Sequence, residues 1–206
     1  MEMSNKYGIP QHLFKCWQPE DESWSMTPAT YASRFIQKME KRYGMRDRNW
    51  TYVGVDFHDE GPRIWFPGNR ETPPRGHIAI SLSVEAYSDR QEMVYQLAHE
   101  CVHLLAPVVG DGAPVIEEGL ATVFSEDMIE FWCNNTNKQA YTVVQKYREA
   151  ASRVRDLLRL EPEAIKKLRA VQPDFYRMTN DTFERAALEK VPPSLIDELL
   201  SKFKEK

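Results

Sequence analysis

Hydrophobic and polar positions along the chain predict an early helix followed by three strands. The helix covers residues 27–44, where Thr27 is a suitable N-cap, Pro28 suits the first turn and Gly44 suits the end. From residue 50 the hydrophobic period changes from helical spacing to two, which is typical of a strand with one buried face. Turn-forming residues divide this region into three predicted strands, at residues 50–57, 63–66 and 77–82.

The remainder of the chain is predicted to be helical. A helix that begins near Ser88 or Asp89 and ends before Pro107 contains the sequence HECVH. A second helix runs from Pro114 to about residue 132. Helical spacing of hydrophobic residues predicts further helices that begin near Thr136, Pro162, Asp181 and Ser194. We therefore expect an α+β fold in which a small, mainly antiparallel sheet precedes two helices and a C-terminal helical bundle.

Length and composition favour one globular unit. The chain has 206 residues, of which 42% are hydrophobic, enough for one core but too few for two large domains. We expect a single domain over residues 1–206. Its parts are an irregular, aromatic-rich N-terminal arm at 1–26, an α+β core at 27–132 and a helical part at 133–206.

Charge and hydropathy argue against several classes of partner. The formal net charge is −4 and no long run of Lys or Arg occurs, so we expect neither a nucleic acid nor a membrane surface as partner. No stretch approaches the roughly 18 apolar residues of a membrane span, and the first residues lack a signal-peptide pattern. The three cysteines form no CxxC pair, which favours reduced thiols. We expect a cytoplasmic location, and the sequence does not define an oligomeric state.

The sequence HECVH, residues 99–103, puts two histidines four positions apart with a glutamate between them. On a helix, positions i and i+4 lie on the same face, so His99 and His103 can share a metal ion. Glu100 lies about 100° further round the helix. A carboxylate there can take a proton from a water molecule that attacks a carbonyl group. The pattern therefore predicts two metal ligands and a general base.

The hydrophobic stripe of this helix runs opposite the two histidines, which argues against a pair of histidines packed in the core. A solvated polar face remains the structural alternative unless another element covers that side. The following helix offers such a cover, a stripe of small residues headed by Glu118 and completed by Ala121, Thr122 and Ser125. Small side chains let two helices approach closely, which could bring Glu118 to the histidines as a third ligand. Glu117 points elsewhere on this helix.

HECVH together with the string Glu118-Gly119-Leu120-Ala121 resembles the gluzincin metallopeptidases, the group that includes thermolysin and the aminopeptidase N family. The aminopeptidase N side is closer, because its motif commonly reads Asn-Glu-Gly-Phe-Ala where this chain has Glu117-Glu118-Gly119-Leu120-Ala121. The resemblance implies one Zn²⁺ ion held by His99, His103 and Glu118, with Glu100 as general base. It also implies a zincin-like fold, in which a small sheet precedes the HExxH helix.

The motifs cover residues 99–121, and the similarity in element order extends from about residue 50 to 132. The sequence contains neither the β-rich N-terminal domain of the large aminopeptidases nor their Gly-x-Met-Glu-Asn string, so it is similar to a reduced gluzincin core of the minigluzincin type. Family members also use a downstream Tyr or His to stabilise the oxyanion. Tyr176 is the candidate that the resemblance suggests here, and a tyrosine that closes the core is the alternative.

The sequence supports three hypotheses of different classes. The leading hypothesis is a zinc-dependent peptidase that acts on a peptide or protein substrate, with a strand at 63–66 or 77–82 pairing with the substrate backbone. The second is a non-catalytic zinc-binding domain whose cleft docks a partner protein. The third has no metal and treats HECVH as a polar helix face.

Overall fold

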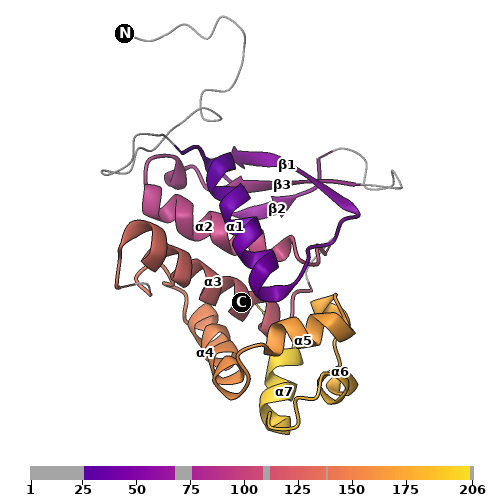
Figure 1. Cartoon of the computed structure of the whole chain (residues 1–206). Coiled ribbons are helices and arrows are strands. Elements are labelled where there is room, and N and C mark those ends of the chain that lie inside the picture. The colour runs from indigo at the N-terminus through magenta and orange to yellow at the C-terminus, as the bar shows by residue number, and fades with distance from the viewer. Residues whose placement is uncertain (1–25, 68–75, 109–111, 138, 205–206) are drawn as a thin grey trace, which may run out of the picture.

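The structure, a computed structural model, describes residues 26–67, 76–108, 112–137 and 139–204. These residues form an α+β fold with seven α-helices, two short 3-10 helices and a three-stranded sheet (Figure 1). The predicted N-terminal arm lies outside the described residues except for Met26, which is buried. Within the described part, no helix is both long enough and apolar enough to cross a membrane.

The first helix, α1 (Pro28–Tyr43), begins and ends as predicted. The hydroxyl of Thr27 accepts a hydrogen bond from the amide of Thr30, and this capping bond satisfies one of the free amides of the first turn. Gly44 ends the helix with a φ of 94°, in the region of backbone space that favours glycine. The buried face of α1 packs against the HECVH helix and the sheet.

The expected three strands are present, but the sheet is mixed and its longer pairing is parallel. β1 (Trp50–Phe57) pairs in parallel with β3 (Gly76–Leu82), and β2 (Arg63–Trp65) pairs antiparallel with β3, which gives the order β1-β3-β2. The last five residues of β3 are all buried, which is typical of a central strand, whereas the short β2 is largely exposed and suits an edge. The expectation of a mainly antiparallel sheet was therefore wrong, because β3 lies between the two strands that are adjacent in sequence.

β1 contains a β-bulge at Val53. Tyr52 and Gly54 lie opposite consecutive residues of β3, so Val53 is an additional residue in the strand. Gly54 has a φ of 143°, a conformation that L side chains rarely adopt. As a result Val53 is 52% exposed while Val55 is buried, although strict alternation would put both on one face.

The HECVH helix is α2 (Arg90–His103), and α3 (Val115–Cys133) lies between it and α4 (Gln145–Leu160) in Figure 1. The carboxylate of Asp89 caps α2 at one of the two predicted start positions. Because α3 packs against α2 and against α4, 13 of its 19 residues are buried. A helix in this position has no broad solvated face, so its polar residues must find partners inside the protein.

α4 begins at Gln145, and the prediction that this helix starts near Thr136 was wrong. Segment 141–144 lies outside the helix, and of its residues only Thr142 is buried. The hydroxyl of Thr142 donates to the carboxylate of Glu126, and this tertiary contact holds the chain in a non-helical path. The apolar residues that extended the predicted helix upstream are exposed ones, Val143 and Val144.

Three short helices complete the described chain, namely α5 (Ala164–Val171), α6 (Asn180–Arg185) and α7 (Pro193–Leu200). The N-caps of α6 and α7 are Thr179 and Pro192 in place of the predicted Asp181 and Ser194. Each α-helix contributes buried residues to one hydrophobic core, so the C-terminal helices and the sheet-containing part pack together. The two 3-10 helices are η2 (Glu85–Tyr87) and η3 (Phe175–Arg177).

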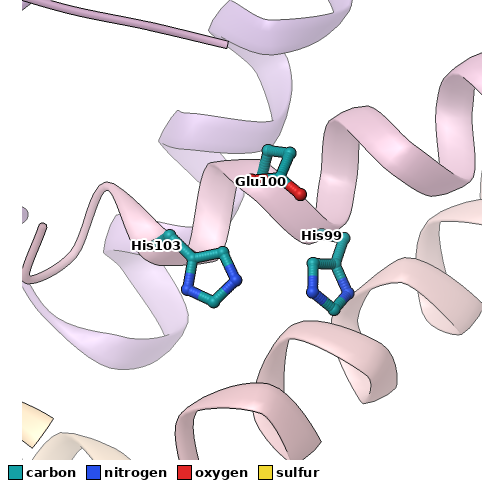
Figure 2. A group of neighbouring side chains, drawn as sticks. All are labelled: His99, Glu100 and His103. Atoms are coloured by element: carbon teal, nitrogen blue, oxygen red, sulfur yellow. The ribbon is translucent and has the colours of Figure 1, made fainter. Parts of the chain in front are cut away.

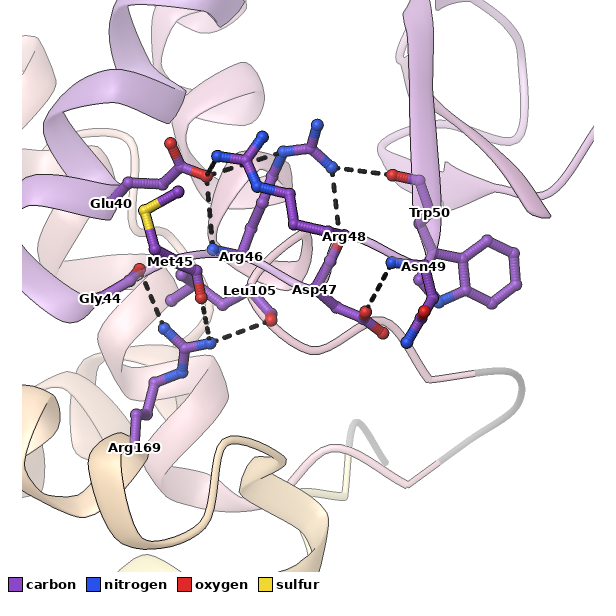
Figure 3. Close-up of polar contacts among 10 residues, drawn as sticks. All are labelled: Glu40, Gly44, Met45, Arg46, Asp47, Arg48, Asn49, Trp50, Leu105 and Arg169. Carbon is purple, nitrogen blue, oxygen red and sulfur yellow. Dashed lines mark hydrogen bonds and ion pairs between the residues drawn. The ribbon is translucent and has the colours of Figure 1, made fainter. Parts of the chain in front are cut away.

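Arg169 of α5 joins the C-terminal helices to the end of α2 (Figure 3). Its buried guanidinium donates to five main-chain carbonyl oxygens at 2.9 to 3.2 Å, those of Tyr43, Gly44, Met45, Leu105 and Pro173. Burial lowers the pKa of Arg169 to about 10, a direction that nearby acidic groups oppose. Since Leu105 lies two residues after His103, the last residue of α2, this arginine also helps to hold the C-terminal end of the HECVH helix.

Candidate metal centre

α2 presents His99 and His103 on one side, as their spacing predicts (Figure 2). The centroids of the two imidazole rings lie 5.2 Å apart, and each side chain is 12% exposed. One potential ligand atom from each of His99, Glu100 and His103 lies within 4.8 Å of the other two. This group of two imidazoles and a carboxylate is positioned to hold a metal ion.

α3 brings Glu118 to both histidines. Its Oε2 atom lies 3.2 Å from Nε2 of His99, and its Oε1 atom lies 3.7 Å from Nε2 of His103. The other residues of the small stripe are buried, as a close approach of the helices requires: Ala121, Thr122 and Ser125. The two hydroxyls among them donate to carbonyl oxygens one turn earlier in α3, so the stripe leaves no hydroxyl unsatisfied.

Glu117 also reaches the site, contrary to the expectation that it points elsewhere. Its Oε1 atom lies 2.8 Å from Nδ1 of His103, and the residue is only 2% exposed. Its second carboxylate oxygen is buried and has no hydrogen-bond partner among the described residues. Glu117 and Glu118 therefore lie against different ring nitrogens of His103, an arrangement that helical spacing alone did not reveal. The signal in the sequence is the acidic pair itself, at the first turn of α3.

The charges in the site shift the pKa of several groups. Burial alone would lower the pKa of His103, but Glu118, Glu117 and Glu100 outweigh burial and raise this pKa to about 10. Burial alone would raise the pKa of Glu118, but the two histidines lower it to about 2. Burial raises the pKa of Glu100, assisted by the neighbouring carboxylates and opposed by the histidines. Negative charge is thus concentrated around two imidazoles, which favours a bound cation.

The site opens into a cavity of about 870 Å³. Helices α2 and α3 supply the histidines and the carboxylates, including Glu100, which is buried but still lines the cavity. The edge strand β2 supplies a further part of the lining, and the rest includes segment 141–144 and Tyr147 at the start of α4. A ligand in this cavity would therefore contact the sheet edge and three helices.

Among the described residues, the tyrosine whose ring contacts a site histidine is Tyr147. Its ring centroid lies 5.6 Å from that of His99, at an interplanar angle of 77°. Tyr176, the candidate suggested by the family resemblance, lies in η3, is 46% exposed and is outside the cavity lining, with the guanidinium of Arg177 over its ring. Sequence reasoning missed Tyr147 because the periodicity assigned it to the core stripe of a longer helix.

The C-terminal segment 201–204 contacts the chain at the start of α3 and at the start of α4. The carbonyl of Ser201 accepts from the amide of Val115, and the amide of Phe203 donates to the carbonyl of Ala113. The ring of Phe203 lies 4.8 Å from that of Tyr147. These contacts tie the chain that enters α3, immediately before Glu117, to the start of α4.

Comparison of the chain with protein-family models, with curated proteins and with solved structures finds no match. The similarity to gluzincins consequently stays at the level of the HECVH and Glu118–Ala121 motifs. What the protein can do chemically is set by the residues that the structure brings together around the two histidines.

Proposed function

We propose that the protein is a zinc-dependent metallopeptidase of the gluzincin type. The observation that carries the proposal is the position of Glu118, whose two oxygens lie 3.2 and 3.7 Å from Nε2 of His99 and Nε2 of His103. Two imidazole nitrogens and one carboxylate are a ligand set typical of catalytic zinc sites, which keep a fourth position for water or substrate. The third ligand would come from a second helix, so a bound metal ion would also link α2 to α3.

The donor atoms fit zinc. Calcium and magnesium prefer oxygen ligands, whereas paired imidazoles favour zinc and other transition metals. When bound, the ion supplies a Lewis acid that polarises a carbonyl group and lowers the pKa of water. His99, His103 and Glu118 would hold it. Glu117 would accept a hydrogen bond from Nδ1 of His103 and so fix the ring with Nε2 toward the ion.

Glu100 is assigned as general base. It is buried beside the two histidines, and burial holds its pKa above the usual value for a glutamate, which makes it a better proton acceptor. It takes a proton from the water molecule that attacks the peptide carbonyl, and it returns that proton to the leaving amine as the C–N bond breaks. A positioned base of this kind contributes roughly 10² to 10⁴ in rate.

The edge strand β2 supports a peptide as substrate. In the order β1-β3-β2 one side of β2 has no partner strand among the described residues, and β2 lines the cavity. An unpaired strand edge offers main-chain donors and acceptors to an extended peptide. Tyr147, whose ring contacts His99 in the same cavity, is assigned to stabilise the oxyanion in place of Tyr176.

The alternative is a non-catalytic zinc-binding domain that docks a partner protein. Exposed apolar residues at the cavity, among them Val143, are the observation that favours it. The two functions share the metal and differ in turnover.

The deciding experiment combines metal analysis with a peptide-library cleavage assay. Purified wild-type protein is expected to contain one zinc per chain and to cleave peptides until a chelator is added. Glu100→Gln should keep zinc and lose nearly all turnover, and His99→Ala should lose zinc. Glu189→Gln, which removes an exposed acid away from the cavity, serves as the matched control and should behave as wild type.

Zinc without cleavage of any library member would establish the docking domain in place of the peptidase. A Glu100→Gln variant as active as wild type would refute the role of that base. Wild-type protein that takes up no zinc would leave HECVH as a polar helix face and would overturn both functions.

A further inference from the structure

Exposed apolar side chains gather around the metal-site cavity. The described residues include nine large hydrophobic side chains that are exposed, and three of them line this cavity: Trp65, Val143 and Val144. Val143 is 75% exposed, more than any other of the nine. Apolar side chains that gather in water beside a candidate active site are more readily explained by binding than by packing.

Hydrogen bonds to the buried residue Thr142 fix the segment that carries the two valines. Thr142 is 2% exposed, and its hydroxyl donates to Oε1 of Glu126 at 2.8 Å. The hydroxyl of Tyr95 lies 2.9 Å from the same threonine oxygen, whose only proton is already directed at the carboxylate, so Tyr95 donates. Arg155 pairs with the other oxygen of Glu126, and Arg148 donates to the carbonyl of Thr142. Side chains from α2, α3 and α4 thus converge on one residue.

The fixed, buried position of Thr142 also fixes the positions of the two residues that follow it. Thr142 is buried, and the next two residues, Val143 and Val144, are 75% and 48% exposed in the cavity lining. A binding surface whose conformation is already fixed loses little conformational entropy when a ligand binds to it. Burying the Glu126 carboxylate beneath an exposed segment costs solvation, which its hydrogen bonds from Thr142 and Arg155 offset.

The charged groups in the cavity lining already have partners or belong to the candidate metal centre, so they offer few contacts to a charged ligand side chain. Arg63 pairs with Glu60 at 2.7 Å, and Glu92 accepts a hydrogen bond from Gln96 at 2.8 Å. The remaining acidic groups of the lining belong to the metal centre: Glu100, Glu117 and Glu118. A charged side chain placed against Val143 and Val144 would lose hydration without gaining a partner among the described residues, whereas an apolar side chain would be removed from water.

We propose that Val143 and Val144, together with Trp65 of β2, form a subsite for a large apolar side chain of the peptide substrate. This inference rests on the proposed function and names its substrate class. The substrate backbone pairs with the free edge of β2, and one side chain next to the scissile bond contacts the two valines. Thr142 is the positioning residue of this subsite.

The test uses zinc-loaded full-length protein and peptides that differ at a single position beside the scissile bond. Leu, Phe or Met at that position should give a kcat/KM about 10 to 200 times that of Ala, and Lys or Asp should be poorer still. The double variant Val143→Asp/Val144→Asp should lose at least about tenfold of this preference and should favour Lys over Leu relative to wild type.

Val53→Asp is the matched control, because Val53 is also an exposed valine, lies on β1 and is outside the cavity lining. It should leave the preference unchanged. Melting temperatures of all variants show whether each is folded. Binding is measured separately by fluorescence anisotropy, with labelled Leu- and Ser-containing peptides and zinc-loaded Glu100→Gln, so that the subsite is tested without turnover.

The outcomes separate this inference from the proposed function. Cleavage with no preference for apolar residues, or an unchanged preference in the folded Asp double variant, overturns the subsite and leaves the peptidase standing. Binding of the Leu peptide that depends on the two valines, without cleavage by wild type, supports the subsite and overturns the peptidase. Neither binding nor cleavage of any peptide overturns both.

Discussion

The replacement of Glu117 by glutamine tests how the candidate metal centre is supported. Oε1 of Glu117 lies 2.8 Å from Nδ1 of His103, inside the protein at 2% exposure. Glutamine has nearly the same shape and can still accept a hydrogen bond through its side-chain oxygen, but it carries no charge. The substitution therefore weakens the contact to His103 and leaves the three proposed zinc ligands in place.

The expected loss follows from the two kinds of hydrogen bond. A bond to a charged group contributes about 1.5–3 kcal/mol and a neutral one about 0.5–1.5 kcal/mol. The difference, about 1–1.5 kcal/mol, corresponds to roughly a tenfold increase in the Kd for zinc. Glu117→Ala removes the acceptor altogether and leaves Nδ1 of His103 buried without a partner, so its Kd should rise by up to about a hundredfold.

The assay is competition for zinc against a chromophoric chelator, at a pH where the protein is folded by circular dichroism. Glu92→Gln is the control, because it removes a negative charge from the same cavity without removing a contact to either histidine. Its Kd should stay close to that of wild type. If Glu117→Gln and Glu92→Gln bind zinc equally tightly, then Glu117 does not support His103 and the reasoning is wrong.

Three further expectations concern stability. Gly119→Ala should destabilise the protein by about 1–3 kcal/mol in urea, because its Cβ would lie 2.4 Å from the carbonyl oxygen of Ala150 in α4, and equal or greater stability would contradict this close packing. Thr142→Val should cost about 1–3 kcal/mol, since buried Glu126 loses a donor, while a Kd for zinc like that of wild type is expected. In metal-free protein, the raised pKa of His103 stabilises the fold fully below pH 6.5, its ordinary value, and this stabilisation is lost as the pH rises through about 10. Melting temperatures across that range should fall more steeply for wild type than for His103→Gln, and parallel curves would rule the effect out.

The parts of the site that depend on a single helix could be predicted from the sequence. His99 and His103 share a face because four residues nearly complete one helical turn, and this holds wherever the helix packs. The small residues after Glu118 pointed to a helix that can approach closely, and this helix does bring Glu118 to both histidines. Each of these two predictions depends on the spacing of residues within a single helix.

What sequence reasoning missed depends on contacts between distant segments. The non-helical path of segment 141–144 comes from the bond between Thr142 and Glu126, and it was assigned to a helix because its apolar residues fit the helical period. Tyr147 was placed in the core for the same reason. β3 is buried on both faces and lies between β1 and β2. The residues next to β3 in the sequence do not reveal this central position.

The contacts of segment 201–204 have a consequence for how the candidate metal centre forms. The amide of Val115 and the carbonyl of Ala113, on the approach to α3, are paired by residues about ninety positions later in the chain. During synthesis on the ribosome, HECVH and Glu118 leave the tunnel long before those partners exist. We expect the proposed zinc site to reach its full affinity only after residues 201–203 have paired with the approach to α3, so that shorter nascent chains carry a looser site.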